Sequence, residues 1–158
     1  MKTILFVCTA NIARSPMAAA LFNKLVGDMG LDDQFRAESA GTWGMDDLPA
    51  ADDGQKVMRN RGLDTSSHRS RVVTGEILKN ADLILTMEAG HAEALKIEFR
   101  DMRGKIYLLS EMVGLPYNIG DPFGSGVGKF DETAGELEFI LEAGINKMIK
   151  LAIGDAED

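Results

Sequence analysis

Short apolar runs alternate along this chain with longer stretches in which apolar residues recur every three or four positions. The short runs are bounded by polar or turn residues, and several are rich in β-branched and aromatic side chains, which predicts buried β-strands. The longer stretches predict amphipathic helices. Strands that alternate with helices are typical of an α/β fold with a parallel sheet and right-handed crossovers. The expected strands are 3–7, 35–39, 81–87 and 105–109, and the expected helices are 16–27, 50–62, 90–100 and 132–153.

Prolines and glycines refine this pattern at the helix ends and in one long loop. Pro16 suits the first position of a helix, where its missing N–H costs nothing, and Gly62 suits the position just after a helix. The segment 112–129 holds two prolines and five glycines in eighteen residues, which predicts a loop of unusual length. Such loops in compact domains are often functional. The acidic tail 154–158 is expected to fray.

The composition is that of an ordinary globular protein: 45% of the 158 residues are apolar and 27% are charged, and the length fits one domain over residues 1–158. The net charge of −8 argues against a general nucleic-acid binder, so any anion site has to be local. No segment approaches the roughly 20 consecutive apolar residues of a membrane span, and the N-terminus has no signal-peptide pattern. We therefore expect no nucleic-acid or membrane partner and a cytoplasmic location.

The only cysteine, Cys8, directly follows the first apolar run, and Arg14 comes six positions later. In open parallel sheets, ligands bind beyond the carboxyl ends of the strands, commonly at a turn from strand to helix. Inward-pointing backbone N–H groups in such a turn bind an anion, and the planar fork of Arg14 would complete the site. The same positive charges would favour the thiolate of Cys8, placed to attack a bound phosphoryl group. The alternative, from residue type alone, is a buried packing cysteine.

A leaving alkoxide or phenoxide also needs a proton, a contribution typically worth about 10²–10⁴-fold in rate. Asp121, in the glycine-rich loop, is the candidate general acid, because Pro122 fixes the backbone beside it and flanking glycines allow a close approach. After this transfer, the same carboxylate would be able to take a proton from water. The alternative is that Asp121 and Pro122 form a plain turn.

The stretch LFVCTANIARSP (5–16) is similar to the signature of the low-molecular-weight protein tyrosine phosphatase family. Four further segments resemble the family in its order, so nearly the whole chain is covered. The resemblance implies a single-domain, three-layer α/β fold with a four-stranded parallel sheet flanked by helices. It also implies a monomer that works through a phosphocysteine intermediate, without a metal or other cofactor. The four segments are SAGT (39–42), SSHRSR (66–71), ADLILTME (81–88) and DPFG (121–124).

Carried onto this chain, the resemblance makes Cys8 the nucleophile, Asp121 the general acid and Arg14 the residue that binds phosphate and stabilises the transition state. Ser15 would donate to the thiolate, with capping of the first helix as its alternative role. The backbone that cradles the phosphate comprises Thr9, Ala10, Asn11, Ile12, Ala13, Arg14 and Ser15. A supporting network comprises Asn11, Ser39 and His68, and the walls of the substrate site comprise Trp43, Met45 and Phe123.

Two departures from the family bear on regulation and on substrate. Many members carry a second cysteine in the loop, and Ala13 stands at that place here, so an internal disulfide is impossible and Cys8 is open to irreversible oxidation. Tyrosine-directed members usually have two aromatic residues after Asp-Pro, whereas Phe123 is followed here by Gly124, as in the family's arginine phosphatase branch. In the cysteine loop, however, the arginine phosphatase branch has a threonine at the place of Ile12. An isoleucine suits an aromatic ring, so we favour phosphotyrosine.

The expected partners are therefore a phosphorylated protein substrate and inorganic phosphate or other oxyanions in the active site. Protein arginine phosphatase is the alternative activity within the family. Two non-enzymatic alternatives are a module that binds a phosphorylated partner and a redox sensor that needs only an acidic thiol. A lone cysteine nearly excludes the family's arsenate reductase branch, which passes electrons through additional cysteines.

Overall fold

Four parallel strands form the sheet at the centre of the molecule, in the order β2-β1-β3-β4. The computed structural model describes residues 1–155. β1 is central and its residues are almost all buried, as expected for a strand covered on both faces. The strands are β1 (Lys2–Cys8), β2 (Phe35–Gly41), β3 (Leu83–Thr86) and β4 (Ile106–Leu108), which confirms all four expected strands with shifts of a few residues at their ends.

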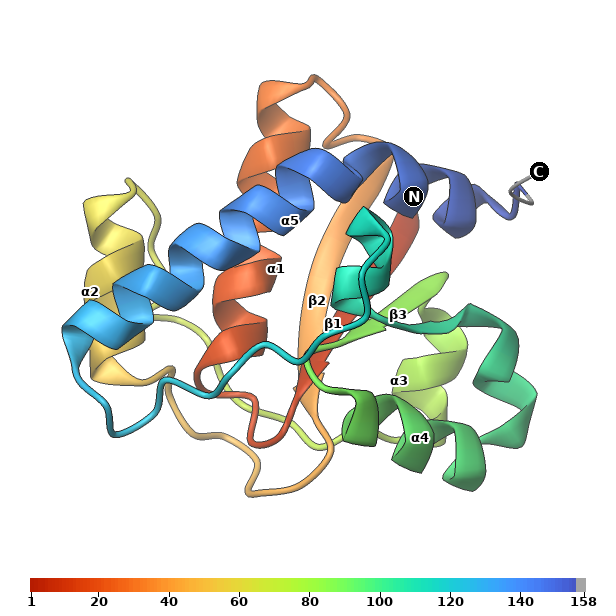
Figure 1. Cartoon of the computed structure of the whole chain (residues 1–158), viewed down its shortest axis with the longest axis horizontal. Coiled ribbons are helices and arrows are strands. Elements are labelled where there is room, and N and C mark those ends of the chain that lie inside the picture. Colours follow the sequence, from red (N-terminus) through yellow and green to blue (C-terminus); the bar gives the residue numbers. More distant parts are fainter. Residues whose placement is uncertain (156–158) are drawn as a thin grey trace.

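Helices cover both faces of the sheet and make the three layers that the family resemblance implies (Figure 1). One face packs in a large apolar cluster against α1 (Arg14–Asp28), α2 (Asp52–Asn60) and α5 (Val127–Ile153). The other face packs in a smaller cluster against α3 (Gly75–Asn80) and α4 (Ala89–Glu98). Two 3₁₀ helices flank β4, namely η1 (Arg100–Lys105) and η2 (Leu109–Val113).

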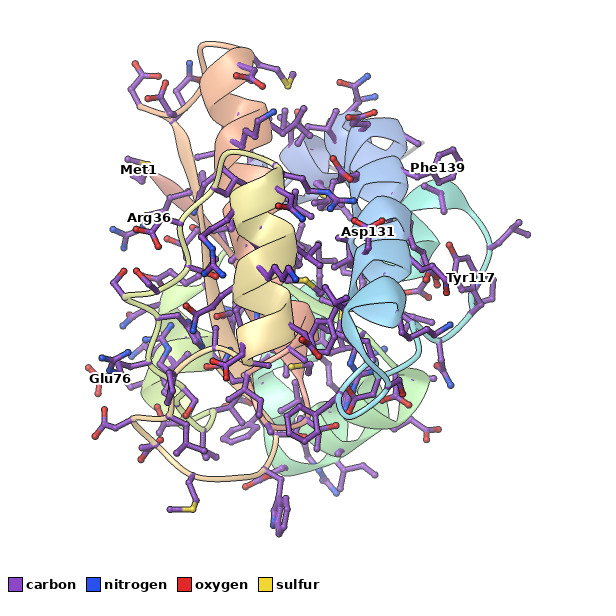
Figure 2. The ribbon with its side chains drawn as sticks, turned by 90° about the vertical axis from the view of Figure 1, so that its left-hand side faces the viewer. Met1, Arg36, Glu76, Tyr117, Asp131 and Phe139 are labelled. Atoms are coloured by element: carbon purple, nitrogen blue, oxygen red, sulfur yellow. The ribbon has the colours of Figure 1, made fainter. Side chains whose placement is uncertain are left out.

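An ion-pair cluster ties α2 to α5, which lie side by side in Figure 2. Arg61, just after α2, donates from Nη1 to Asp131 Oδ1 over 2.7 Å and from Nε to Glu138 Oε1 over 2.8 Å. Gly62 then turns the chain away with a φ of 77°, a left-handed conformation that suits glycine. The expected role of Gly62 just after this helix is thereby confirmed.

Several helix boundaries differ from the sequence prediction. α1 begins at Arg14, two residues before Pro16, so this proline lies within the first turn, where its missing N–H still costs nothing. The N-cap is Ala13, so the alternative role of Ser15 as the cap is wrong. α3 was not predicted, because its six residues are too few to show helical periodicity. α5 begins at Val127 instead of 132, which shortens the expected loop to residues 114–126.

The outer edge of β2 is covered by other parts of the chain. The Asn23 side chain accepts a hydrogen bond from Ala37 N (2.8 Å) and donates one to Ala37 O (3.3 Å). Farther along, Gly41 N donates to Arg71 O and Val73 N donates to Gly41 O, both over 2.8 Å. The side-chain amide and the segment 71–73 thus take the place of a fifth strand.

Within residues 1–155, no helix is long and apolar enough to cross a membrane. The expected fraying of the tail falls mainly on residues 156–158, which lie outside the described part of the chain.

Candidate active site

A cavity of about 140 Å³ lies where β1 ends and α1 begins, at the carboxyl edge of the sheet. Parallel strands bring the loops that follow them to this same edge, so residues far apart in sequence meet here. The cavity is lined by Cys8, Thr9, Ala10, Ile12, Ala13, Arg14, Asp121 and Phe123.

The loop from Thr9 to Ala13 presents free backbone donors. None of its five N–H groups donates a hydrogen bond to any residue among 1–155. A run of free N–H groups next to the N-terminus of a 15-residue helix concentrates partial positive charge. The loop therefore has the chemistry of an oxyanion cradle.

Asn11 fixes the shape of this loop. It is fully buried and has a φ of 60°, a left-handed conformation that non-glycine residues adopt at a cost of about 1–3 kcal/mol. Its side chain donates from Nδ2 to Ser15 Oγ (2.8 Å) and Ser39 Oγ (2.9 Å), and its Oδ1 accepts from Arg71 N (3.0 Å). These contacts hold the strained residue in place.

His68 adds a further bond, because its Nε2 lies 2.7 Å from the carbonyl oxygen of Asn11. A carbonyl oxygen only accepts, so Nε2 carries the proton and donates. Burial lowers the pKa of His68, which favours a neutral ring at neutral pH. The contacts expected among Asn11, Ser39 and His68 are thus present.

The sulfur of Cys8 lies 2.9 Å from Ser15 Oγ, and both residues are buried. Because Ser15 Oγ already accepts from Asn11 Nδ2, its own proton is free to point at the sulfur. Cys8 is 3% exposed and packs in the larger core cluster, as the alternative of a buried packing cysteine expects, but it also lines the cavity.

Arg14 is the largest fully buried side chain, at 1% exposure, and it lies at the start of α1. Its Nη1 donates to Glu88 Oε2 and to Ile119 O, both over 2.7 Å. Its Nη2 is 3.4 Å from Thr9 Oγ1 and 3.8 Å from Asp121 Oδ2. Its Nε has no partner within residues 1–155. The Nε–Nη2 edge of the guanidinium group therefore retains donor capacity for an anion.

Glu88 and His91 also belong to this site, although neither was predicted to lie there. They follow β3 at the same edge of the sheet, at the N-cap and in the first turn of α4. Glu88 supplies the carboxylate that holds Arg14, and the ring of His91 contacts Thr9 over 2.9 Å. The signal available in the sequence was their position directly after an apolar strand.

Asp121 lies at the mouth of the cavity with its side chain 49% exposed. Its Oδ1 accepts from Phe123 N over 3.0 Å, as in the turn that Asp-Pro sequences favour, while its Oδ2 faces Arg14. Phe123 lines the cavity with 59% of its surface exposed. Thus Asp121 makes the turn contact and also lies beside the cavity.

The remaining predicted residues lie behind the loop or outside the cavity. Asn11, within the loop, does not line the cavity, and neither do the three residues that contact it: Ser15, Ser39 and His68. Trp43 and Met45 do not line it: their side chains are 76% and 68% exposed, and Trp43 N donates to Thr9 O. Among residues 1–155, no group of three or more His, Cys, Asp or Glu side chains is arranged to hold a metal ion.

Comparisons with known proteins agree with this geometry. Residues 3–150 match the model of the low molecular weight phosphotyrosine protein phosphatase family. The chain is 33% identical to a probable low molecular weight protein-tyrosine-phosphatase, EpsP, of Ralstonia nicotianae, over 84% of this chain and 86% of that protein. It is 34% identical to a protein-arginine-phosphatase of Bacillus subtilis, over 87% of this chain and 91% of that protein.

Solved structures give the same answer for the fold. The crystal structure of a low molecular weight protein tyrosine phosphatase from T. tengcongensis has a TM-score of 0.88 and 35% identity, and the match covers 93% of this chain and 99% of that one.

Proposed function

The chain belongs to the low molecular weight phosphotyrosine protein phosphatase family, and we propose that this member hydrolyses phosphotyrosine in proteins through a phosphocysteine intermediate. The observation that carries the proposal is that Cys8 and the buried Arg14 line the same cavity, and that Arg14 Nε has no hydrogen-bond partner within residues 1–155. Burial of an unpaired guanidinium donor is costly, and an oxyanion bound above the sulfur would satisfy it.

In the first step, the thiolate of Cys8 attacks phosphorus, the S–P bond forms and the P–O bond to the leaving group breaks. The free N–H groups of the loop and the Nε–Nη2 edge of Arg14 stabilise the charge on the equatorial oxygens. The Ser15 hydroxyl stabilises the sulfur anion from below. Asp121 donates its proton to the leaving oxygen, which departs as a neutral phenol.

In the second step, the ionised Asp121 takes a proton from a water molecule. The resulting hydroxide attacks the phosphocysteine, the S–P bond breaks, and inorganic phosphate and the Cys8 thiolate are released. Asp121 is protonated again at the end, so the cycle closes without a net change in the enzyme. The exposed position of this carboxyl at the cavity mouth supports both roles.

Ile12 and Phe123 support phosphotyrosine as the substrate, because both are apolar and line the cavity beside Cys8. Two apolar walls suit the faces of a phenyl ring. Phosphoarginine is the second candidate, because the identity to the Bacillus subtilis protein-arginine-phosphatase, 34%, is close to the 33% identity to the tyrosine phosphatase EpsP. The Phe123-Gly124 sequence also favours it.

We extend the proposal to a monomeric, cytoplasmic enzyme that needs no metal ion. The chemistry above needs only protein groups and one water molecule, which supports metal independence. The net charge of −8 supports the expectation that nucleic acid is not a partner.

The test is hydrolysis of p-nitrophenyl phosphate in the presence of EDTA, with vanadate as inhibitor and the Cys8→Ser variant as control. We expect turnover by the wild type, inhibition by vanadate and no turnover by the variant. Phosphotyrosine and phosphoarginine peptides assayed side by side then decide the substrate. A wild type that binds phosphate without hydrolysing either ester or peptide would favour the phosphate-binding module instead.

A further inference from the structure

His91 connects two parts of the site that are far apart in sequence. It lies in the first turn of α4, and its Nδ1 is 3.2 Å from the backbone nitrogen of Glu88. Its Nε2 is 2.9 Å from Thr9 Oγ1 in the phosphate loop. The ring is buried, with a side-chain exposure of 10%. A single imidazole therefore bridges the start of α4 and the loop after β1.

The hydrogen bonds define the protonation state of this ring. The backbone N–H of Glu88 can only donate, so Nδ1 accepts and carries no proton. In the neutral ring the proton is then on Nε2, which donates to Thr9 Oγ1. Burial lowers the pKa of His91 below its ordinary value of 6.5, which favours this neutral form at neutral pH.

Both residues that His91 contacts also contact Arg14. Glu88 Oε2 accepts from Arg14 Nη1 over 2.7 Å, and Thr9 Oγ1 lies 3.4 Å from Arg14 Nη2. The carboxylate of Glu88 is 36% exposed, so burial alone does not fix its position. The bond from its backbone N–H to His91 fixes the turn from which that side chain extends.

We propose that His91 is a positioning residue: its neutral ring ties Glu88 to Thr9 and thereby holds the carboxylate that orients Arg14 toward the oxyanion. The inference rests on the proposed phosphatase function, in which Arg14 binds the phosphoryl group. It adds a residue that touches neither the oxyanion nor Arg14, and that acts on oxyanion binding through Glu88 and Thr9.

Protonation of His91 reverses the arrangement. An imidazolium has two N–H donors and no acceptor, so the bond from Glu88 N is lost. The new positive charge also lies 3.7 Å from Glu88 Oε2, where it competes with Arg14 for that carboxylate. The charged groups facing the ring are Glu88 on its own helix, Arg14 of α1 and Asp121 of the loop before α5. Protonation of His91 therefore weakens the contact between the Glu88 carboxylate and Arg14.

The test uses sulfate, an oxyanion whose charge stays constant between about pH 5 and about pH 8, with its affinity measured by calorimetry. We expect His91→Ala to weaken sulfate binding about 10-fold at neutral pH, because a bond that supports a charged group is lost. His91→Gln should stay within about 3-fold of the wild type, since a glutamine amide accepts from Glu88 N and donates to Thr9. Its amide does not titrate, so the wild type's loss of affinity on acidification should shrink in this variant.

Thr74→Ala is the matched control, because Thr74 caps α3 by accepting from Ile77 N and this cap lies outside the site. It should leave sulfate affinity unchanged. Wild-type affinity in a folded His91→Ala variant, or an unchanged acid response in His91→Gln, would overturn the inference. Sulfate binding needs no turnover, so failure of the wild type to hydrolyse p-nitrophenyl phosphate would overturn the proposed function and leave this result standing.

Discussion

Gly41, the last residue of β2, lies against the backbone of Thr9 with no room for a side chain. A Cβ on Gly41 would be 2.5 Å from the carbonyl oxygen of Thr9 and 3.1 Å from Ala10 C. The φ of Gly41 is not positive, so this glycine is needed for a close approach and not for an unusual turn. The end of β2 therefore supports the phosphate loop from the side.

Gly41→Ala should displace the loop and impair the site. We expect kcat/KM for p-nitrophenyl phosphate to fall by about 10-fold or more, since small displacements of catalytic groups are costly. Overpacking should also lower the free energy of unfolding by roughly 1–3 kcal/mol. Gly27→Ala, in α1, is the control and should retain activity, because apart from its own turn of helix no atom of residues 1–155 lies within 4 Å of its Cβ position. Equal kinetics of the two variants would contradict the role of Gly41.

Asp121→Asn separates binding from proton transfer. An amide cannot protonate the leaving group, so kcat should fall by about 10²–10⁴-fold. Sulfate affinity should be kept or increase, because a negative charge 3.8 Å from Arg14 Nη2 is removed. Asp28→Asn, at the far end of α1, should behave as the wild type. Near-normal hydrolysis of an aryl phosphate by Asp121→Asn would remove it as the general acid.

Ile12→Thr tests the substrate preference. A hydroxyl in place of an apolar wall should favour a polar guanidinium over a phenyl ring, so the ratio of kcat/KM for phosphoarginine to that for phosphotyrosine peptides should rise. Ile97→Thr on the exposed side of α4 is the matched control and should leave the ratio unchanged. An unchanged ratio in Ile12→Thr would show that this position does not set the preference.

Stability should rise with pH through the range in which histidine titrates. Burial lowers the pKa of both His68 and His91, so the unfolded chain takes up protons at a higher pH than the folded protein does. The free energy of unfolding is therefore greatest above the ordinary value of 6.5 and falls as the pH drops through the folded-state values. Urea unfolding at about pH 5.5 and about pH 7.5 measures this difference.

The His91→Gln variant provides the control for this prediction. With one buried histidine removed, the loss of stability between the two pH values should be smaller than in the wild type. The same loss in both proteins would mean that His91 does not contribute to it.

The sequence predicted the fold well because apolar runs and helical spacing report burial directly. All four strands were found, and the loop from Cys8 to Arg14 was located correctly by its place between a strand and a helix. The short helix α3 was missed, since six residues carry too little periodicity. An element is therefore predictable when it is long enough for its own apolar residues to show the period of a helix or a strand.

The parts of the site that escaped prediction depend on contacts across the sheet. No role at the site was predicted for Glu88, because nothing in the chain order shows that it meets Arg14, 74 residues away. His91 and Gly41 were missed for the same reason. Trp43 was expected on a wall of the substrate site, but the residue is 76% exposed and does not line the cavity. The sequence shows that an aromatic residue lies in a loop, but not in which direction its side chain points.

The side chain of Asn23 has a consequence that reaches beyond the single molecule. Bare peptide groups on the margin of a sheet are a template for a strand of another chain and a route to aggregation. The Asn23 side chain hydrogen-bonds to both the N–H and the C=O of Ala37, so these two groups are not available to a strand of another chain. At the opposite margin β4 has only three residues, too few to seed an intermolecular ladder.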